Sequence, residues 1–195
     1  MQVITEKIFL ASQSPRRLQL LKMIALDVEA VKLDFPEESI EFSNPENYVS
    51  KLAEMKMGIA ILQNLNGIIL TADTIVSLNN KILNKPENYS HAVAMLSELS
   101  GKTHEVYTAF SLSNKGETIT GIEKTEVKFK NLLSSEIESY ILTKSPFDKA
   151  GGYGIQDGWG AIFTEKINGC YYNVMGLPLS NLYQKVKELL KIGQV

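Results

Sequence analysis

Two arginines follow a serine-rich turn near the start of the sequence, in Ser12-Gln13-Ser14-Pro15-Arg16-Arg17. Ser14 is suited to cap a helix whose first residue is Pro15. The N–H groups at a helix start attract anions, and the same helix dipole disfavours two arginines in the first turn. A bound phosphate or triphosphate would resolve this conflict, because guanidinium groups pair with phosphate oxygens. The alternative is a surface helix whose arginines are solvated.

A carboxylate comes directly after an apolar run, in Thr71-Ala72-Asp73-Thr74. We expect a strand over 67–72, with Asp73 at its carboxyl end, where α/β proteins place their ligands. In that position Asp73 can hold a divalent metal through oxygen or accept a proton from water. The alternative is an Asp that closes a turn through an Asx hydrogen bond.

Two further segments could contact a ligand. Lys85 precedes Pro86, which keeps it extended and suits either a phosphate contact or an ordinary exposed loop. The glycines of 148–156 permit close approach of backbone to a ligand, and Gln156 can read the edge of a base through its donor and its acceptor. A glycine-rich hairpin loop is the alternative. The sequence has no P-loop and no Gly-x-Gly-x-x-Gly opening a helix, which argues against kinase-like and dinucleotide-binding proteins.

The sequence favours structural roles for its one cysteine and for His104. Cys170 cannot form an internal disulfide, and we expect a buried thiol in a turn leading into a strand. His104 begins an expected strand without a nucleophile motif beside it, which favours a structural histidine. With only His91 and His104 available, a Cys/His zinc site is not expected.

The composition excludes several classes of protein. The 195 residues include 20 Lys+Arg and 22 Asp+Glu, so the net charge of −2 argues against a polynucleotide partner. With 44% hydrophobic and 22% charged residues the chain is not disordered. The longest charge-free run, 167–184, contains Asn and Pro and does not read as a membrane span, and residues 1–7 have no apolar signal core. We expect a cytoplasmic protein without membrane attachment.

Strands and helices alternate along most of the sequence, which predicts an α/β fold with a mixed sheet. Expected strands are 8–11, 28–33, 67–72, 75–78 with 82–83 as a hairpin, two strands within 103–130 joined around 114–116, 161–167 and 170–175. Expected helices begin at Pro15, at Asn44-Pro45, at Ser90 (ending at Gly101), at a capping box on Ser135 (ending near 143) and at Pro178.

Taken together, these segments resemble the Maf family of nucleoside triphosphate pyrophosphatases. The matching stretches, in chain order, are Leu10-Ala11-Ser12-Gln13-Ser14-Pro15-Arg16-Arg17, Ala72-Asp73-Thr74, Lys85-Pro86, Leu99-Ser100-Gly101-Lys102-Thr103-His104, Asp148-Lys149-Ala150-Gly151, Tyr153-Gly154-Ile155-Gln156 and Gly176-Leu177-Pro178. The series covers nearly the whole chain. The chain departs from the family pattern at Gly152 and Met57, where Ala is usual, and in the acidic segment 34–38, which aligns poorly with the acidic loop of the family.

The resemblance implies a fold and a reaction. The implied fold is a twisted mixed β-sheet flanked by helices, with two lobes around a cleft, as in Maf and inosine triphosphatase proteins, in a single domain over 1–195. The implied reaction is attack of water on the α-phosphate of a nucleoside triphosphate, which releases pyrophosphate and the monophosphate and needs a divalent metal, Mg²⁺ or Mn²⁺. Family members are often homodimers.

The resemblance also implies roles for individual residues. Asp73 would be the general base and a metal contact. Glu37 would be a second metal or water contact, in competition with Asp34 and Glu38. The residues matching family positions for base choice are Arg16, Thr74 and Gln156. Those expected around the triphosphate are Ser12, Arg17, Lys56, Lys85 and Lys149.

The motif combination looks like the subgroup that acts on dTTP and UTP, and modified pyrimidine nucleotides are a further option. Two alternatives stay open. One is a nucleotide-binding regulator of cell division that does not hydrolyse its ligand. The other is a pyrophosphatase for purine or methylated guanine nucleotides.

Overall fold

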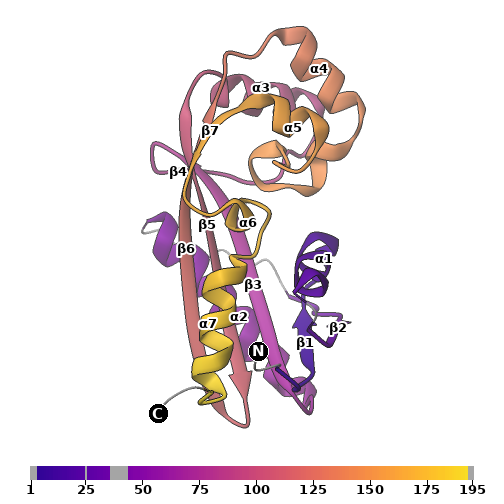
Figure 1. Ribbon diagram of the computed structural model, residues 1–195. Coiled ribbons are helices and arrows are strands. Elements are labelled where there is room, and N and C mark those ends of the chain that lie inside the picture. Colours follow the sequence, from indigo (N-terminus) through magenta and orange to yellow (C-terminus); the bar gives the residue numbers. More distant parts are fainter. Residues whose placement is uncertain (1–3, 25, 36–43, 193–195) are drawn as a thin grey trace. The chain divides into compact units, whose positions relative to one another are not determined.

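The sheet combines parallel and antiparallel strands (Figure 1). The structure, a computed structural model, describes residues 4–24, 26–35 and 44–192. The strand order is β2-β1-β3-β5-β6-β7, and β4 pairs with β3 outside this path. Strand β1 pairs in parallel with β2 and β3, whereas β4 and β7 run antiparallel to their partners. The strands are β1 (Ile8–Ala11), β2 (Val28–Val31), β3 (Ile68–Leu78), β4 (Lys81–Leu83), β5 (Thr103–Asn114), β6 (Glu117–Phe129) and β7 (Thr164–Asn168).

Helices flank this sheet, which confirms the expected mixed α/β class. The α-helices are α1 (Pro15–Met23), α2 (Pro45–Ala60), α3 (Tyr89–Leu99), α4 (Ser134–Leu142), α5 (Gly158–Phe163), α6 (Tyr171–Val174) and α7 (Leu179–Leu189). The 3₁₀ turns are η1 (Ile61–Gln63), η2 (Ser145–Asp148) and η3 (Ala150–Gly152). In the described part of the chain, no helix has the length and apolar character needed to cross a membrane.

The chain forms two compact units, each assembled from separate segments. Unit 1 comprises Met1–Asp73, Thr108–Glu123 and Gly176–Val195. Unit 2 comprises Thr74–Tyr107 and Lys124–Met175. Strands β3, β5 and β6 each contribute residues to both units.

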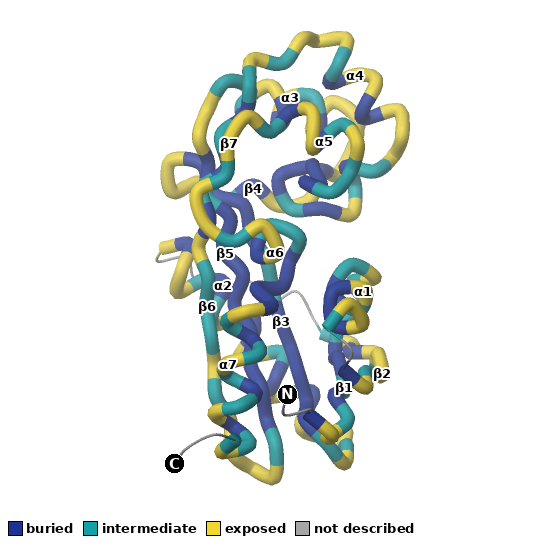
Figure 2. The backbone as a smooth tube through the Cα atoms, in the orientation of Figure 1, coloured by how far each residue is buried: buried dark blue, intermediate teal, exposed yellow. Residues whose placement is uncertain are grey.

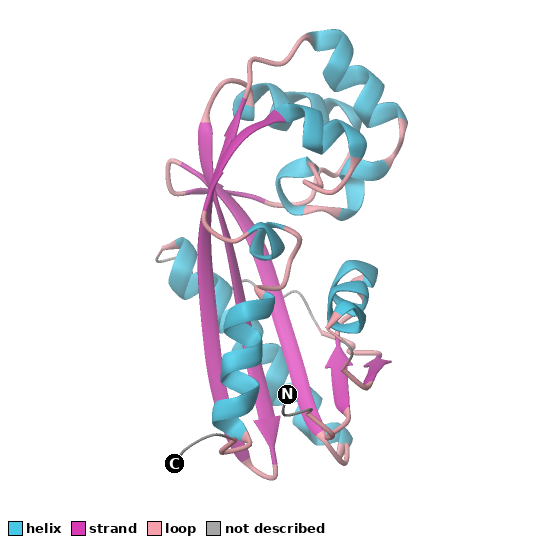
Figure 3. Ribbon diagram, in the orientation of Figure 1, coloured by secondary structure: helices cyan, strands magenta, loops and turns pink. Residues whose placement is uncertain are grey.

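In unit 1 the sheet carries a helix on each face, α2 behind it and α7 in front (Figure 3). Helix α2 buries Met57 and Ala60 against Ile69 of β3. Thr71 Oγ1 donates to the carbonyl of Ala53 at 2.8 Å, which fixes β3 against the middle of this helix. The buried face of α7 contains Leu179, Leu182, Val186 and Leu189.

In unit 2, helices α3, α4 and α5 share an apolar core with the strands. Figure 2 shows the buried stretches of β3 and β5 in dark blue. His104 lies in this core, 1% exposed, with its ring edge-on to Phe129 and to Tyr153. His104 Nε2 lies 2.7 Å from the Tyr153 hydroxyl, so the expected structural histidine is confirmed.

The expected end of the third strand at Ala72 is wrong. Strand β3 continues through Asp73 to Leu78, so Asp73 lies within the strand and not at its carboxyl end. The strand tolerates this carboxylate because Lys56 of α2 pairs with it. The hairpin after β3 is confirmed, and Asn79 and Asn80 both have positive φ, 52° and 63°, as a tight two-residue turn requires.

Two expected helix starts are displaced. Helix α3 begins after Asn88, whose side chain accepts the N–H of His91 at 2.9 Å, so Asn88 and not Ser90 is the cap. Helix α4 begins after Leu133, and Glu136 accepts the N–H of that residue at 2.8 Å. In α3 the capping side chain therefore comes from the preceding loop, whereas in α4 Glu136, inside the first turn, satisfies the N–H of the residue before the helix.

The two strands expected near the C-terminus are only partly present. Residues 161–163 belong to α5, and 170–175 contains the short helix α6 in place of a strand. Asn173 ties α6 down, because its amide donates to Val106 O at 3.0 Å and Thr125 Oγ1 at 2.9 Å. Cys170 is the residue before the first turn of this helix, and its free thiol makes no capping bond and is half-exposed, which corrects the expected buried thiol.

Candidate active site

In unit 1, Asp73 and Lys56 form an ion pair. Lys56 Nζ donates to Asp73 Oδ2, and each side chain is 20% exposed. The Lys56 ammonium also lies 5.2 Å from the centre of the Phe35 ring. Because the bond from Thr71 to Ala53 locks β3 onto α2, both members of the pair sit on fixed backbone. The pair therefore offers a partly accessible carboxylate and a cation beside it.

The Arg17 guanidinium is buried and donates hydrogen bonds to other groups of the chain. Its Nε donates to Gly176 O at 2.9 Å, and its Nη1 donates to Ala72 O at 2.9 Å and Ser12 Oγ at 3.1 Å. Burial lowers the pKa of Arg17, while nearby Asp73 acts in the opposite direction. The expected role of Arg17 at a triphosphate therefore competes with a structural role, joining α1 to β3 and to the segment before α7.

The turn before α1 is arranged around the Ser12 hydroxyl. Ser12 Oγ accepts the N–H of Ser14 at 3.2 Å as well as the bond from Arg17. Ser14 is the N-cap and Pro15 the first helical residue, as expected, although the Ser14 side chain makes no capping bond. Ser12 and Arg16 are both half-buried, so this turn keeps a partly accessible arginine at the start of the helix.

In unit 2, Lys149 lies in a cluster of polar groups and is 8% exposed. Its ammonium donates to Ser145 O at 2.6 Å, Ser145 Oγ at 3.0 Å and Asp148 Oδ1 at 2.6 Å, and it lies 3.4 Å from Asp157 Oδ2. Two carboxylates thus surround one ammonium, which leaves this cluster with a formal excess of negative charge. A phosphate that binds Lys149, as expected, would have to overcome the repulsion of these carboxylates.

Gln156 is attached to the same cluster. Its Nε2 donates to Asp157 Oδ1 at 3.3 Å. Its Oε1 is buried and accepts no hydrogen bond from any residue that the structure describes. Asp157 is not among the residues predicted from the sequence, although its position next to Gln156 could have indicated it.

The remaining predicted residues of unit 2 lie apart from this cluster in the sequence. Thr74 is a half-buried residue of β3, and Lys85 is exposed in the loop after β4. Gly151 N donates to Asn84 O at 3.2 Å, which brings the loop of Lys85 to the glycine-rich segment.

A divalent metal would find few protein ligands in the described ranges. Glu37 and Glu38 lie outside the described residues, and Asp34 is exposed and paired with Lys32 at 2.8 Å. Among the residues described, no three His, Cys, Asp or Glu side chains form a cluster able to hold a metal. Asp73 supplies a carboxylate oxygen, which suits Mg²⁺, since that ion commonly binds through one or two carboxylates together with substrate phosphates and water.

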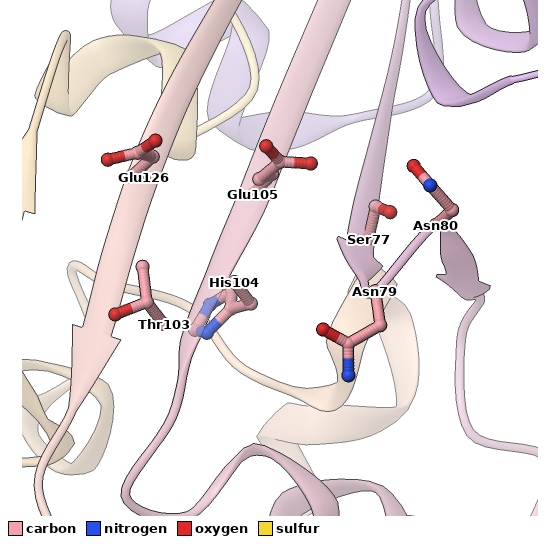
Figure 4. A pocket seen from close by; sticks show the side chains of 7 residues that line it. All are labelled: Ser77, Asn79, Asn80, Thr103, His104, Glu105 and Glu126. Atoms are coloured by element: carbon pink, nitrogen blue, oxygen red, sulfur yellow. The ribbon is translucent and has the colours of Figure 1, made fainter.

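A separate polar cavity of about 300 Å³ opens in unit 2 (Figure 4). The residues lining it are Ser77, Asn79, Asn80, Thr103, His104, Glu105 and Glu126. Glu105 is held by Lys124 and by the Tyr107 hydroxyl, and Glu126 accepts from Asn168 at 3.1 Å. The carboxylates of this cavity are therefore engaged by neighbouring side chains, and none of the residues expected to bind a nucleotide lines it.

Comparison with known proteins identifies relatives over most of the chain. A protein of Thermosipho africanus named dTTP/UTP pyrophosphatase is 47% identical over 177 residues, 91% of this chain and 90% of that protein. One of Bacillus cereus (strain ATCC 14579) with the same name is 46% identical over 182 residues, 93% and 95% of the two chains. The solved structure of the Staphylococcus aureus Ham1 protein aligns with a TM-score of 0.49 and 16% identity, covering 95% of this chain and 98% of that one. The family model described as Maf-like protein matches residues 7–189, and this chain therefore belongs to the Maf family.

Proposed function

We propose that this protein hydrolyses dTTP and UTP to the nucleoside monophosphate and pyrophosphate. The observation that carries the proposal is Asp73, a partly accessible carboxylate held in β3 beside the Lys56 ammonium. The names of the relatives from Thermosipho africanus and Bacillus cereus support the choice of dTTP and UTP.

In the proposed reaction Asp73 accepts a proton from water while the water oxygen forms a bond to the α-phosphorus. The bond from that phosphorus to the bridging oxygen breaks, and pyrophosphate leaves with the bonding electrons. A base of this kind contributes roughly 10²–10⁴ in rate. Because an ammonium has three donors, Lys56 can hold Asp73 and a phosphate oxygen at the same time.

The proposed cofactor is a divalent cation, Mg²⁺ or Mn²⁺, held by Asp73, phosphate oxygens and water. When bound, it neutralises the triphosphate and stabilises charge on the departing pyrophosphate. Glu37 stays the proposed second protein ligand. We also propose that the protein is cytoplasmic and that it forms a homodimer.

Pyrophosphate release from a panel of NTPs and dNTPs, with Mg²⁺ or Mn²⁺, tests this function. We expect UTP and dTTP to be the best substrates, and no release from any nucleotide would overturn the proposal. Asp73→Asn should lower turnover by at least about 10²-fold while calorimetry still detects nucleotide binding. Asp27→Asn is the control, because it removes the same charge from an exposed position of unit 1.

The pairing of Asp73 with Lys56 also favours a second candidate, a nucleotide-binding regulator. The Lys56 ammonium can bind a phosphate oxygen while it holds Asp73, so a protein that only binds its nucleotide could also use this pair. Tight UTP binding without cleavage in the same panel would support the regulator.

A further inference from the structure

Asp157 makes contacts that determine which end of the Gln156 amide is available to a ligand. A carboxylate only accepts hydrogen bonds, so it selects the NH₂ end of the amide. The bond from Gln156 Nε2 to Asp157 Oδ1, at 3.3 Å, therefore leaves Oε1 as the end that can meet a ligand. That oxygen is buried without a donor in the described part of the chain, an arrangement that costs free energy until a donor arrives.

Asp157 itself is held on its other oxygen by three donors. Tyr140 Oη donates to Asp157 Oδ2 at 2.9 Å, Ser145 Oγ donates at 2.6 Å, and Lys149 Nζ lies 3.4 Å away. Burial raises the pKa of Tyr140, so its hydroxyl stays protonated.

The directions of these hydroxyl bonds are fixed. Tyr140 Oη accepts the N–H of Gly154 at 3.0 Å, and Ser145 Oγ accepts from Lys149 at 3.0 Å. Each hydroxyl hydrogen is therefore left to point at Asp157. As a result, Asp157 Oδ2 accepts the hydrogens of the Tyr140 and Ser145 hydroxyls, and Asp157 Oδ1 faces Gln156.

We infer that Asp157 is the positioning residue that makes Gln156 an acceptor for a base carrying a ring N–H. Uracil and thymine present an N–H at N3, whereas cytosine presents a lone pair there. An acceptor at Gln156 Oε1 accordingly favours uracil and thymine over cytosine. This inference rests on the proposed hydrolysis of UTP and dTTP, and it assigns the discrimination between pyrimidines to Asp157 acting through Gln156.

The variant Asp157→Asn tests the inference, because it should reverse the Gln156 amide. The three donors at the Oδ2 side require the oxygen of the new side chain to lie there. Its NH₂ group then faces Gln156 and selects the carbonyl end, which turns Nε2 towards the ligand. We expect the ratio of kcat/KM for UTP to that for CTP to fall at least about tenfold.

Asp148→Asn is the matched control. It removes the same charge from the same lysine, since Asp148 Oδ1 lies 2.6 Å from Lys149 Nζ, and the Asp148 side chain is 58% exposed. Its UTP to CTP ratio should stay within about twofold of the wild-type ratio, whatever its overall rate. An equal loss on both nucleotides in Asp157→Asn would show a merely structural role and overturn the inference.

A measurement without nucleotide separates this inference from the proposed function. In ¹⁵N-labelled wild-type protein, the Gln156 side-chain NH₂ signals are assigned by their absence in Gln156→Met. We expect their exchange with solvent to be slower than that of the exposed Gln13 and Gln19. Equal exchange would overturn the positioning role, even if Asp157→Asn fails to fold. Slow exchange in a protein that cleaves no nucleotide would instead refute only the proposed hydrolysis.

Discussion

Replacing Arg17 by methionine should destabilise the protein, because the guanidinium satisfies buried backbone groups. Arg17→Met has a similar length but no donors, so it leaves Gly176 O and Ala72 O without the two bonds of 2.9 Å. An unsatisfied buried acceptor costs about 1–3 kcal/mol, and removing a buried charge recovers part of the loss. We therefore expect the free energy of unfolding to fall by about 3 kcal/mol.

Urea and thermal unfolding measure this change. For a chain of this length about 3 kcal/mol corresponds to a lowering of Tm by roughly 6–12 °C. Arg16→Met is the control, since Arg16 lies next in the helix, carries the same charge and is half-buried; its loss of stability should be clearly smaller. If Arg17→Met unfolds like the wild type but loses turnover, Arg17 contacts the substrate and the structural account is refuted.

Two further predictions concern unit 2. Burial lowers the pKa of His104 to about 3, below its ordinary 6.5, so acid protonates the unfolded chain first and stability falls as the pH drops from 6.5 towards 3. Urea unfolding at pH 7, 5.5 and 4.5 measures this loss, and His104→Gln should remove up to about 1.4 kcal/mol of it per pH unit. His91→Gln, at an exposed position, should leave the dependence of the free energy of unfolding on pH unchanged. A methyl group at Gly160 would lie 1.9 Å from Gly154 O, so Gly160→Ala should cost at least about 1–3 kcal/mol in the same measurement. Gly158→Ala, where nothing lies within 4 Å of the added carbon, should leave stability unchanged or raise it by up to about 1 kcal/mol, and equal effects of the two changes would contradict this packing.

Local signals in the sequence were sufficient for much of the fold. The pairs Ser14-Pro15 and Asn44-Pro45 mark the starts of α1 and α2, and Asn44 Oδ1 accepts the N–H of Asn47 at 2.8 Å. The turn between β5 and β6 lies at Lys115 and Gly116, both with positive φ. Such features depend on neighbours in the sequence, so a single chain reveals them.

The errors arose where distant residues decide the local structure. In the sequence, Asp73 has the features of a residue that ends a strand. In the folded chain Lys56 of α2 pairs with it, and the strand continues. The segment around Tyr171 resembles a strand, yet the bonds from Asn173 to β5 and β6 hold it as a helix. Periodicity contains no information about either contact.

Contacts between distant residues also decide how the candidate site is charged. These contacts bear on the role of the metal. The sequence presents Arg17, Lys56 and Lys149 as cations available to a triphosphate. In the folded chain Arg17 binds backbone carbonyls, Lys56 binds Asp73, and Lys149 lies between Asp148 and Asp157. Cations that already have internal partners neutralise a polyphosphate less effectively than free ones, because their fields are partly cancelled. A divalent cation would supply that missing positive charge, which gives the proposed metal requirement a physical reason independent of the family resemblance.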